Sequence, residues 1–125
     1  MAGDRPDIPL VIGGERVRSG DVAHSTMPHD HQHVLADWHQ ARREDVEQAI
    51  AAAGEAHREW SGWSQQERSA VFLKAAELLA TTDRATVNAA TMLGQSKTAH
   101  QAEIDSAAEL IDFWRFNPFY ADELA

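Results

Sequence analysis

The spacing of apolar residues changes near residue 43. Before that point, short apolar runs are separated by glycine, proline and serine, which is typical of short strands joined by tight turns. After it, apolar residues recur three and four positions apart, which is the period of an amphipathic helix. We therefore expect short β-hairpins in residues 8–40, followed by helices in residues 43–120.

Two hairpins are predicted in the first part. Residues 10–12 and 15–18 flank the pair Gly13-Gly14, a strong signal for a tight turn. A second pair of strands is expected on either side of the turn-like residues 28–31, with residues 33–39 as its second strand. Such short strands bury little apolar surface, so they need a larger sheet or a helical layer to lie on.

Four helices are predicted in the second part. The first runs from Arg43 to about Trp60 and has an apolar stripe along one face. The second begins with a capping box, in which Ser64 accepts from the backbone at Glu67 and the Glu67 carboxylate accepts from the Ser64 amide. The apolar stripe of the first helix comprises Val46, Ala49, Ile50, Ala53, His57 and Trp60.

The third and fourth predicted helices are bounded by capping and breaking residues. Residue 82 or 83 caps the third, and Gly94 is a plausible C-terminal stop. The fourth spans about 97–116, because Pro118 lacks an amide donor and disfavours helical angles in the residue before it.

The fourth predicted helix mixes aromatic rings and carboxylates on one flank. Phe113 and Phe116 lie there with Asp105, Glu109 and Asp112, so we expect something to cover this flank. A carboxylate desolvated by rings is typical of a substrate-facing acid or a proton relay, and Glu109 is either such a group or a core-edge carboxylate paired with a basic residue. The opposite apolar stripe comprises Ile104, Ala107, Ala108, Leu110, Ile111 and Trp114.

The histidine cluster His29, His31 and His33 has the alternation of a metal-binding strand. The segment opens with proline and contains Asp30, so it reads more naturally as a turn, and no fourth ligand beyond Asp30 is identifiable. Structural or exposed histidines are therefore favoured, and no metal site is predicted.

Composition limits the function further. The 125 residues contain no cysteine, which excludes disulfides, thiolate metal sites and a cysteine nucleophile within this chain. The net charge is −9, which argues against a nucleic-acid surface. No apolar run is long enough to span a membrane and no signal segment is recognisable, so we expect a cytoplasmic protein with neither membrane nor nucleic-acid partners.

A resemblance to a known family is carried by six stretches: Ile8–Gly14, Met27–His31, Phe72–Leu79, Thr91–Lys97, Gln101–Asp105 and Glu109–Asn117. Together they resemble the 1-pyrroline-5-carboxylate dehydrogenases, also called L-glutamate γ-semialdehyde dehydrogenases, a branch of the aldehyde dehydrogenase superfamily. The resemblance implies an oxidoreductase of proline metabolism that uses NAD to oxidise L-glutamate γ-semialdehyde to L-glutamate. It also implies a cysteine nucleophile and a homo-oligomer in the full-length enzymes.

For this chain the resemblance implies an N-terminal portion of the α/β aldehyde dehydrogenase-like fold, covering residues 1–125. Family members are several times longer, so the NAD-binding core and the catalytic domain are expected to be absent here. We expect this chain to bind no NAD, to contribute no catalytic residue and to be inactive alone. Glu109 matches a tunnel-lining glutamate of the branch and is the one residue expected to bind substrate.

Two other functions are compatible with the sequence. One is a free-standing helical interaction module that binds a partner through the flank around Phe113 and Phe116. The other is a histidine-rich metal carrier.

Overall fold

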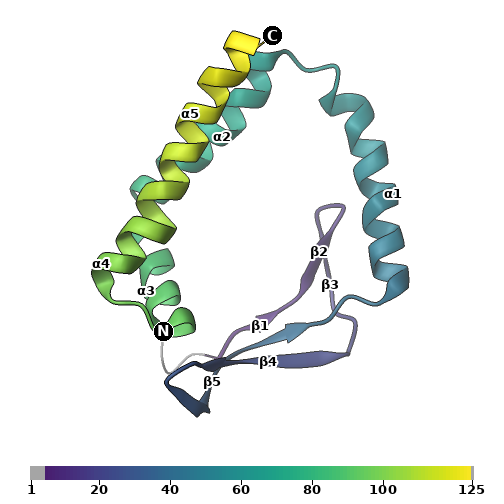
Figure 1. The fold of residues 1–125 in the computed structure, drawn as a ribbon. Coiled ribbons are helices and arrows are strands. Elements are labelled where there is room, and N and C mark those ends of the chain that lie inside the picture. Colours follow the sequence, from purple (N-terminus) through teal and green to yellow (C-terminus); the bar gives the residue numbers. More distant parts are fainter. Residues whose placement is uncertain (1–4, 125) are drawn as a thin grey trace. The chain divides into compact units, whose positions relative to one another are not determined.

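The structure is a computed structural model that describes residues 5–124 (Figure 1). The chain divides into two compact units, one up to Gly62 and one from Trp63. The first contains β1 (Asp7–Ile8), β2 (Leu10–Ile12), β3 (Glu15–Val17), β4 (Val22–Met27), β5 (Asp30–His39) and α1 (Arg43–Trp60). The second contains α2 (Gln65–Ala80), α3 (Arg84–Gln95), α4 (Ala99–Ala102), the π-helix η1 (Glu103–Ala108) and α5 (Glu109–Leu124).

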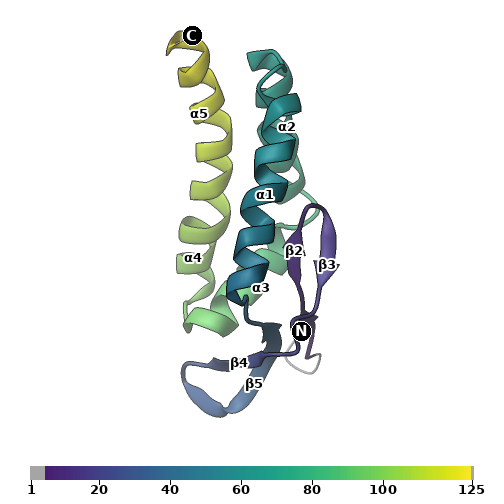
Figure 2. The same cartoon turned by 90° about the vertical axis from the view of Figure 1, so that its right-hand side faces the viewer.

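The first predicted hairpin is confirmed. Strands β2 and β3 pair antiparallel, with Ile12 opposite Glu15. The turn between them is Gly13-Gly14, whose φ angles are 58° and 84°. Glycine reaches these left-handed angles without the steric penalty of a Cβ atom. The end of β2 contacts α1 (Figure 2), and a Cβ added at Gly13 would lie 3.5 Å from that of Ala52.

The second predicted hairpin is also present, but its turn is shorter than expected. Met27 of β4 pairs with Asp30 of β5, so Pro28 and His29 alone form the turn. The prediction of a turn over residues 28–31 is wrong, because antiparallel pairing with β4 extends the strand back through Asp30. The two-residue strand β1 pairs parallel to β5 and completes a sheet of order β1-β5-β4.

Helix α1 forms where its period predicts, yet its apolar stripe is not buried. Val46 is 48% exposed and Ile50 is 68% exposed. Within the described part of the first unit, the main contact of α1 is with β2. A three-residue strand is too small to cover the face of an 18-residue helix.

Helix α2 begins at the predicted capping box. The Ser64 hydroxyl accepts from the Glu67 amide at 3.2 Å, and the Ser64 amide donates to Glu67 Oε2 at 2.8 Å. Further along α2, Ala76 and Leu79 pack with Ile111 of α5 to form the core of the second unit. Figure 1 shows α2 and α5 lying side by side.

The predicted stop of the third helix is wrong by two residues. Helix α3 runs through Gly94 to Gln95, and Ser96 takes the left-handed conformation at φ 52°. The next helix is capped by Thr98, which must be extended to accept from the Gln101 amide. The chain thus leaves α3 at Ser96 rather than at Gly94.

The predicted end of the fourth helix near Phe116 is also wrong. Figure 2 shows α4 and α5 as one continuous column, and α5 continues through Pro118 to Leu124. Pro118 is buried and lies beside side chains of α2, so packing offsets the missing amide donor. The π-helical segment was not predicted, since hydrophobic periodicity does not distinguish one wide turn from an ordinary turn.

The π-helical segment divides the apolar stripe predicted for this helix. Ala107 is fully buried and Ile111 is 3% exposed, whereas Ile104 is 48% and Leu110 is 36% exposed. A wheel that assumes one constant period cannot place residues on both sides of a π turn correctly. None of the helices in residues 5–124 is long and apolar enough to cross a membrane.

Candidate functional site

Glu109 lies in an open groove of about 800 Å³ on one flank of η1 and α5. The groove brings together the carboxylates and rings that the sequence places on that flank. Its lining is Ile104, Asp105, Ala108, Glu109, Asp112, Phe113, Phe116, Asn117 and Tyr120.

The groove is not closed by the residues that the structure describes. Phe113 is 51% exposed, Phe116 is 55% exposed, and Glu109 is exposed as well. The expected desolvation of Glu109 by the rings is therefore not present in residues 5–124. Within the same residues Glu109 makes no ion pair, and its role stays a prediction.

The neighbouring acidic side chains differ in their surroundings. Asp105 accepts from Lys97 Nζ at 2.5 Å, and the two side chains are 45% and 29% exposed. This pair holds the loop before α4 against the π-helix. Asp112 is exposed on the groove. Asp105 is thus partly neutralised, whereas Asp112 and Glu109 both present negative charge to the groove.

Glu109 begins the α-helix that follows the π turn. Its amide donates to the carbonyl oxygen of Ile104, five residues earlier, where an α-helix would use the residue four earlier. The direction of the Glu109 side chain therefore depends directly on the π turn.

A polar cluster between α3 and η1 was missed by the sequence reasoning. Asn88 Nδ2 donates to Glu103 Oε2 at 2.6 Å, and Asn88 Oδ1 accepts from the Ser106 hydroxyl at 3.1 Å. Arg84 donates from Nε to Glu103 Oε2 at 3.2 Å and also pairs with Oε1. The Arg84 bonds, followed by that from Asn88, lower the pKa of Glu103, and the Glu103 bond raises the pKa of Arg84. Residues 84 and 88 lie one turn apart on a helix, and that spacing was the available signal that their side chains share one face.

A second groove of about 520 Å³ lies between α2 and α5. Its lining is mainly apolar and includes Phe72, Phe113, Trp114 and Pro118, with Arg68 near Gln65 of α2. Arg68 Nη2 donates to Gln65 Oε1 at 3.0 Å, so the cation is held along its own helix. The two grooves share Phe113 and Asn117 in their linings.

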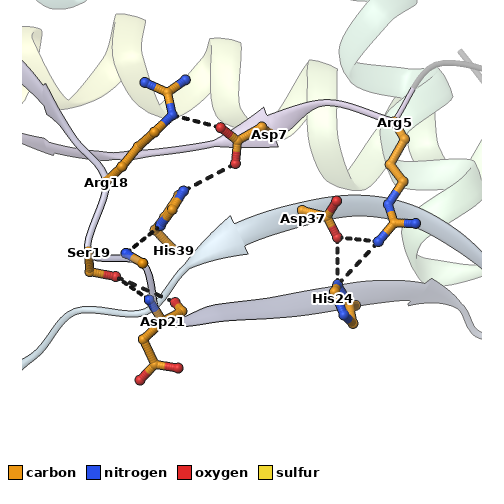
Figure 3. Close-up of polar contacts among 9 residues, drawn as sticks. Arg5, Asp7, Arg18, Ser19, Asp21, His24, Asp37 and His39 are labelled. Atoms are coloured by element: carbon orange, nitrogen blue, oxygen red, sulfur yellow. Dashed lines mark hydrogen bonds and ion pairs between the residues drawn. The ribbon is translucent and has the colours of Figure 1, made fainter.

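The first unit contains two polar clusters (Figure 3). His39 is 7% exposed; its Nδ1 accepts from the Gly20 amide at 3.2 Å, and its Nε2 lies 3.2 Å from Asp7 Oδ1. Arg18 donates to Asp7 Oδ2 at 2.7 Å and is the main cause that lowers the pKa of Asp7. His39 thus joins β5, β1 and the turn at Gly20, which is a structural role.

The second cluster centres on Asp37. Arg5 donates to Asp37 Oδ1 at 2.6 Å, and His24 Nδ1 lies 2.5 Å from the same oxygen. The hydrogen bond from Arg5, and then that from His24, lower the pKa of Asp37. The cluster lies at the surface and ties the segment before β1 to β4 and β5.

The histidine cluster does not form a metal site in the described residues. His31 and His33 lie on β5 and His29 lies in the turn before it. Residues 5–124 contain no group of three histidine, aspartate or glutamate side chains that could hold a metal ion.

The chain is similar in sequence to proteins that carry the same enzyme name. A Delta-1-pyrroline-5-carboxylate dehydrogenase of Dictyostelium discoideum, named as mitochondrial, is 52% identical over 118 residues, which are 94% of this chain and 21% of the relative. The human mitochondrial enzyme of the same name is 45% identical over 124 residues, 99% of this chain and 22% of the relative.

Solved structures agree with the fold. The Delta-pyrroline-5-carboxylate dehydrogenase of Mycobacterium tuberculosis bound with NAD superposes with a TM-score of 0.95 at 44% identity, over 98% of this chain and 23% of the other. The 1-pyrroline-5-carboxylate dehydrogenase of Thermus with bound NAD gives a TM-score of 0.81 at 28% identity, over 94% and 22%.

The chain thus spans about a fifth of the length of these relatives and corresponds to an N-terminal segment of them. The expected resemblance and fold class are confirmed. Residues 17–125 match the aldehyde dehydrogenase family. That match covers most of the sequence, and the chain belongs to the aldehyde dehydrogenase family.

Proposed function

We propose that these residues form the N-terminal part of an NAD-dependent dehydrogenase that oxidises L-glutamate γ-semialdehyde, the open form of 1-pyrroline-5-carboxylate, to L-glutamate. The observation that supports this most is the 52% identity to a named pyrroline-5-carboxylate dehydrogenase over 94% of the chain. NAD bound to the Mycobacterium tuberculosis relative supports the choice of cofactor. The coarser assignment, membership of the aldehyde dehydrogenase family, does not depend on this proposal.

The share of the chemistry that we assign to this chain is substrate orientation. The semialdehyde carries an ammonium group, and the groove presents the carboxylates of Glu109 and Asp112. Glu109 accepts a hydrogen bond from that ammonium group and so fixes which way the aldehyde points. A charge-assisted hydrogen bond of this kind is among the stronger polar interactions in proteins.

The remaining steps require groups from outside this chain. The sequence contains no cysteine for attack on the aldehyde and no glycine-rich dinucleotide motif. The thiolate, the NAD site and the contacts of a homo-oligomer are therefore assigned to the other parts of the whole enzyme. The chain alone is expected to be inactive.

The test is a chimera in which residues 1–125 replace the matching segment of the Mycobacterium tuberculosis relative. The chimera is expected to form NADH from NAD and pyrroline-5-carboxylate, and the separate chain is not. NADH formation by the separate chain would contradict the division of labour. An interaction module without catalysis would instead fail to support activity in the chimera.

The compartment remains a separate proposal. We propose the cytoplasm, the compartment expected from the sequence. The Dictyostelium and human relatives are named as mitochondrial. Fractionation of the source cells, with immunodetection of these residues, distinguishes a cytoplasmic from a mitochondrial location. Antibody signal in an organelle fraction would overturn the proposal.

A further inference from the structure

The π turn determines which way Glu109 points. An α-helix advances about 100° per residue, so one additional residue in a turn rotates everything after it by about that amount. The Glu109 amide bonds to Ile104 across this wider turn. If the turn closed to an ordinary α turn, Glu109 and Phe113 would rotate away from their present relation to Asp105.

Three side chains of the π segment are held from outside it. Glu103 is bonded to Arg84 and Asn88 of α3, and Ser106 is bonded to the same Asn88. Asp105 is paired with Lys97. Within residues 5–124, Asn88 is the one residue outside the segment whose side chain hydrogen-bonds to two of these positions, Glu103 and Ser106.

The Ser106 hydroxyl also interacts within the segment. It lies 2.5 Å from the carbonyl oxygen of Ala102, four residues earlier, which an α-helix would offer to the backbone amide of Ser106. The hydroxyl thus donates to a carbonyl oxygen at the point where the π turn interrupts the regular series of backbone hydrogen bonds. The one hydroxyl proton is shared between this carbonyl and Asn88 Oδ1, 3.1 Å away, so Ser106 links α3 to the interrupted turn.

We propose that Asn88 is a positioning residue: through Ser106 and Glu103 it keeps the π turn open and so directs Glu109 into the groove. The proposal has two halves. The structural half, that Asn88 keeps the π turn open, concerns only the second unit. The catalytic half, that Asn88 acts on the reaction through Glu109, rests on the proposed role of Glu109. Asn88 itself does not line the groove and is assigned no contact with substrate.

The structural half is tested by amide hydrogen exchange of the 125-residue chain. Asn88→Ala and Ser106→Ala are expected to raise exchange at the Glu109 amide about tenfold or more, because local opening limits exchange. Ser106→Thr, which keeps the hydroxyl, is expected to retain protection. The matched control is Ser69→Ala, which removes a buried serine that accepts from Gln65 on α2. Unchanged exchange in Asn88→Ala, or an equal rise in Ser69→Ala, would overturn the proposal.

The catalytic half is tested in the chimera described above. Asn88→Ala is expected to raise KM for pyrroline-5-carboxylate about fivefold while KM for NAD stays unchanged. In a Glu109→Ala background the same change is expected to add nothing, because both act through one group. Additive losses would overturn the positioning role. An unmodified chimera without activity would instead count against the proposed function, and hydrogen exchange would still decide the structural half.

Discussion

The amide of Glu109 donates to the carbonyl oxygen of Ile104, five residues before it. The residue expected to touch substrate is therefore the first residue after the π turn. Wide turns of this kind occur frequently at functional sites, where they redirect a side chain within an otherwise regular helix. In this chain the redirected face is a groove that carries Asp105, Glu109 and Asp112.

Glu109→Ala in the chimera is expected to lower kcat/KM for pyrroline-5-carboxylate about 10- to 100-fold, since a hydrogen bond to a charged group contributes about 1.5–3 kcal/mol. Steady-state kinetics with glutaric semialdehyde, which lacks the ammonium group, should show little effect of the same change. Asp122→Ala, on the same helix but outside the groove lining, is the matched control and should behave as the parent. Equal losses with both aldehydes would contradict the assigned contact.

Ser64→Ala is expected to lower the free energy of unfolding by about 1 kcal/mol, because it removes the acceptor for the Glu67 amide at the start of α2. Urea unfolding followed by helical circular dichroism measures the change. Ser64→Asp, which keeps an acceptor at the cap, should cost less. A Ser64→Asp variant as unstable as Ser64→Ala would show that the cap contributes little.

Acid is expected to destabilise the second unit through Glu103. Its pKa lies below the ordinary value of 4.5, chiefly because of Arg84. The unfolded chain therefore binds a proton at higher pH than the folded chain, so this contribution is complete above 4.5 and is lost as the pH falls through the lowered pKa. The urea midpoint of unfolding should fall less between neutral and acidic pH in Glu103→Gln than in the parent chain. An equal fall in both chains would contradict the account.

Two glycines should respond to alanine with opposite signs. Gly14→Ala is expected to destabilise the first unit by about 1–2 kcal/mol, because φ is +84° there. Gly54→Ala on α1, where an added Cβ meets nothing within 4 Å, is expected to stabilise by about 0.5–1 kcal/mol. Thermal unfolding of both variants measures the difference, and a stabilised Gly14→Ala would contradict the turn geometry.

Local signals in the sequence predict the hairpin at Gly13-Gly14 and the capping box at Ser64 correctly, since both depend on residues close together in the chain. The errors arise where contacts between residues far apart in the sequence determine the local structure. Pro118 stays helical because α2 packs beside it, and β1 exists only through pairing with β5.

The groove was predicted in part. A helical wheel places Glu109 with Phe113 and Phe116, but it does not show the π turn or the contacts from Asn88. It also predicts desolvation of Glu109 that residues 5–124 do not provide, because exposure depends on what else packs on that flank.

The most direct test of the central claim is the rate of NADH formation by the chimera of residues 1–125 with the rest of the Mycobacterium tuberculosis relative. We predict kcat/KM for pyrroline-5-carboxylate within about tenfold of that of the parent enzyme. A chimera that folds and binds NAD, yet forms no NADH from pyrroline-5-carboxylate, would contradict the claim that these residues belong to such a dehydrogenase.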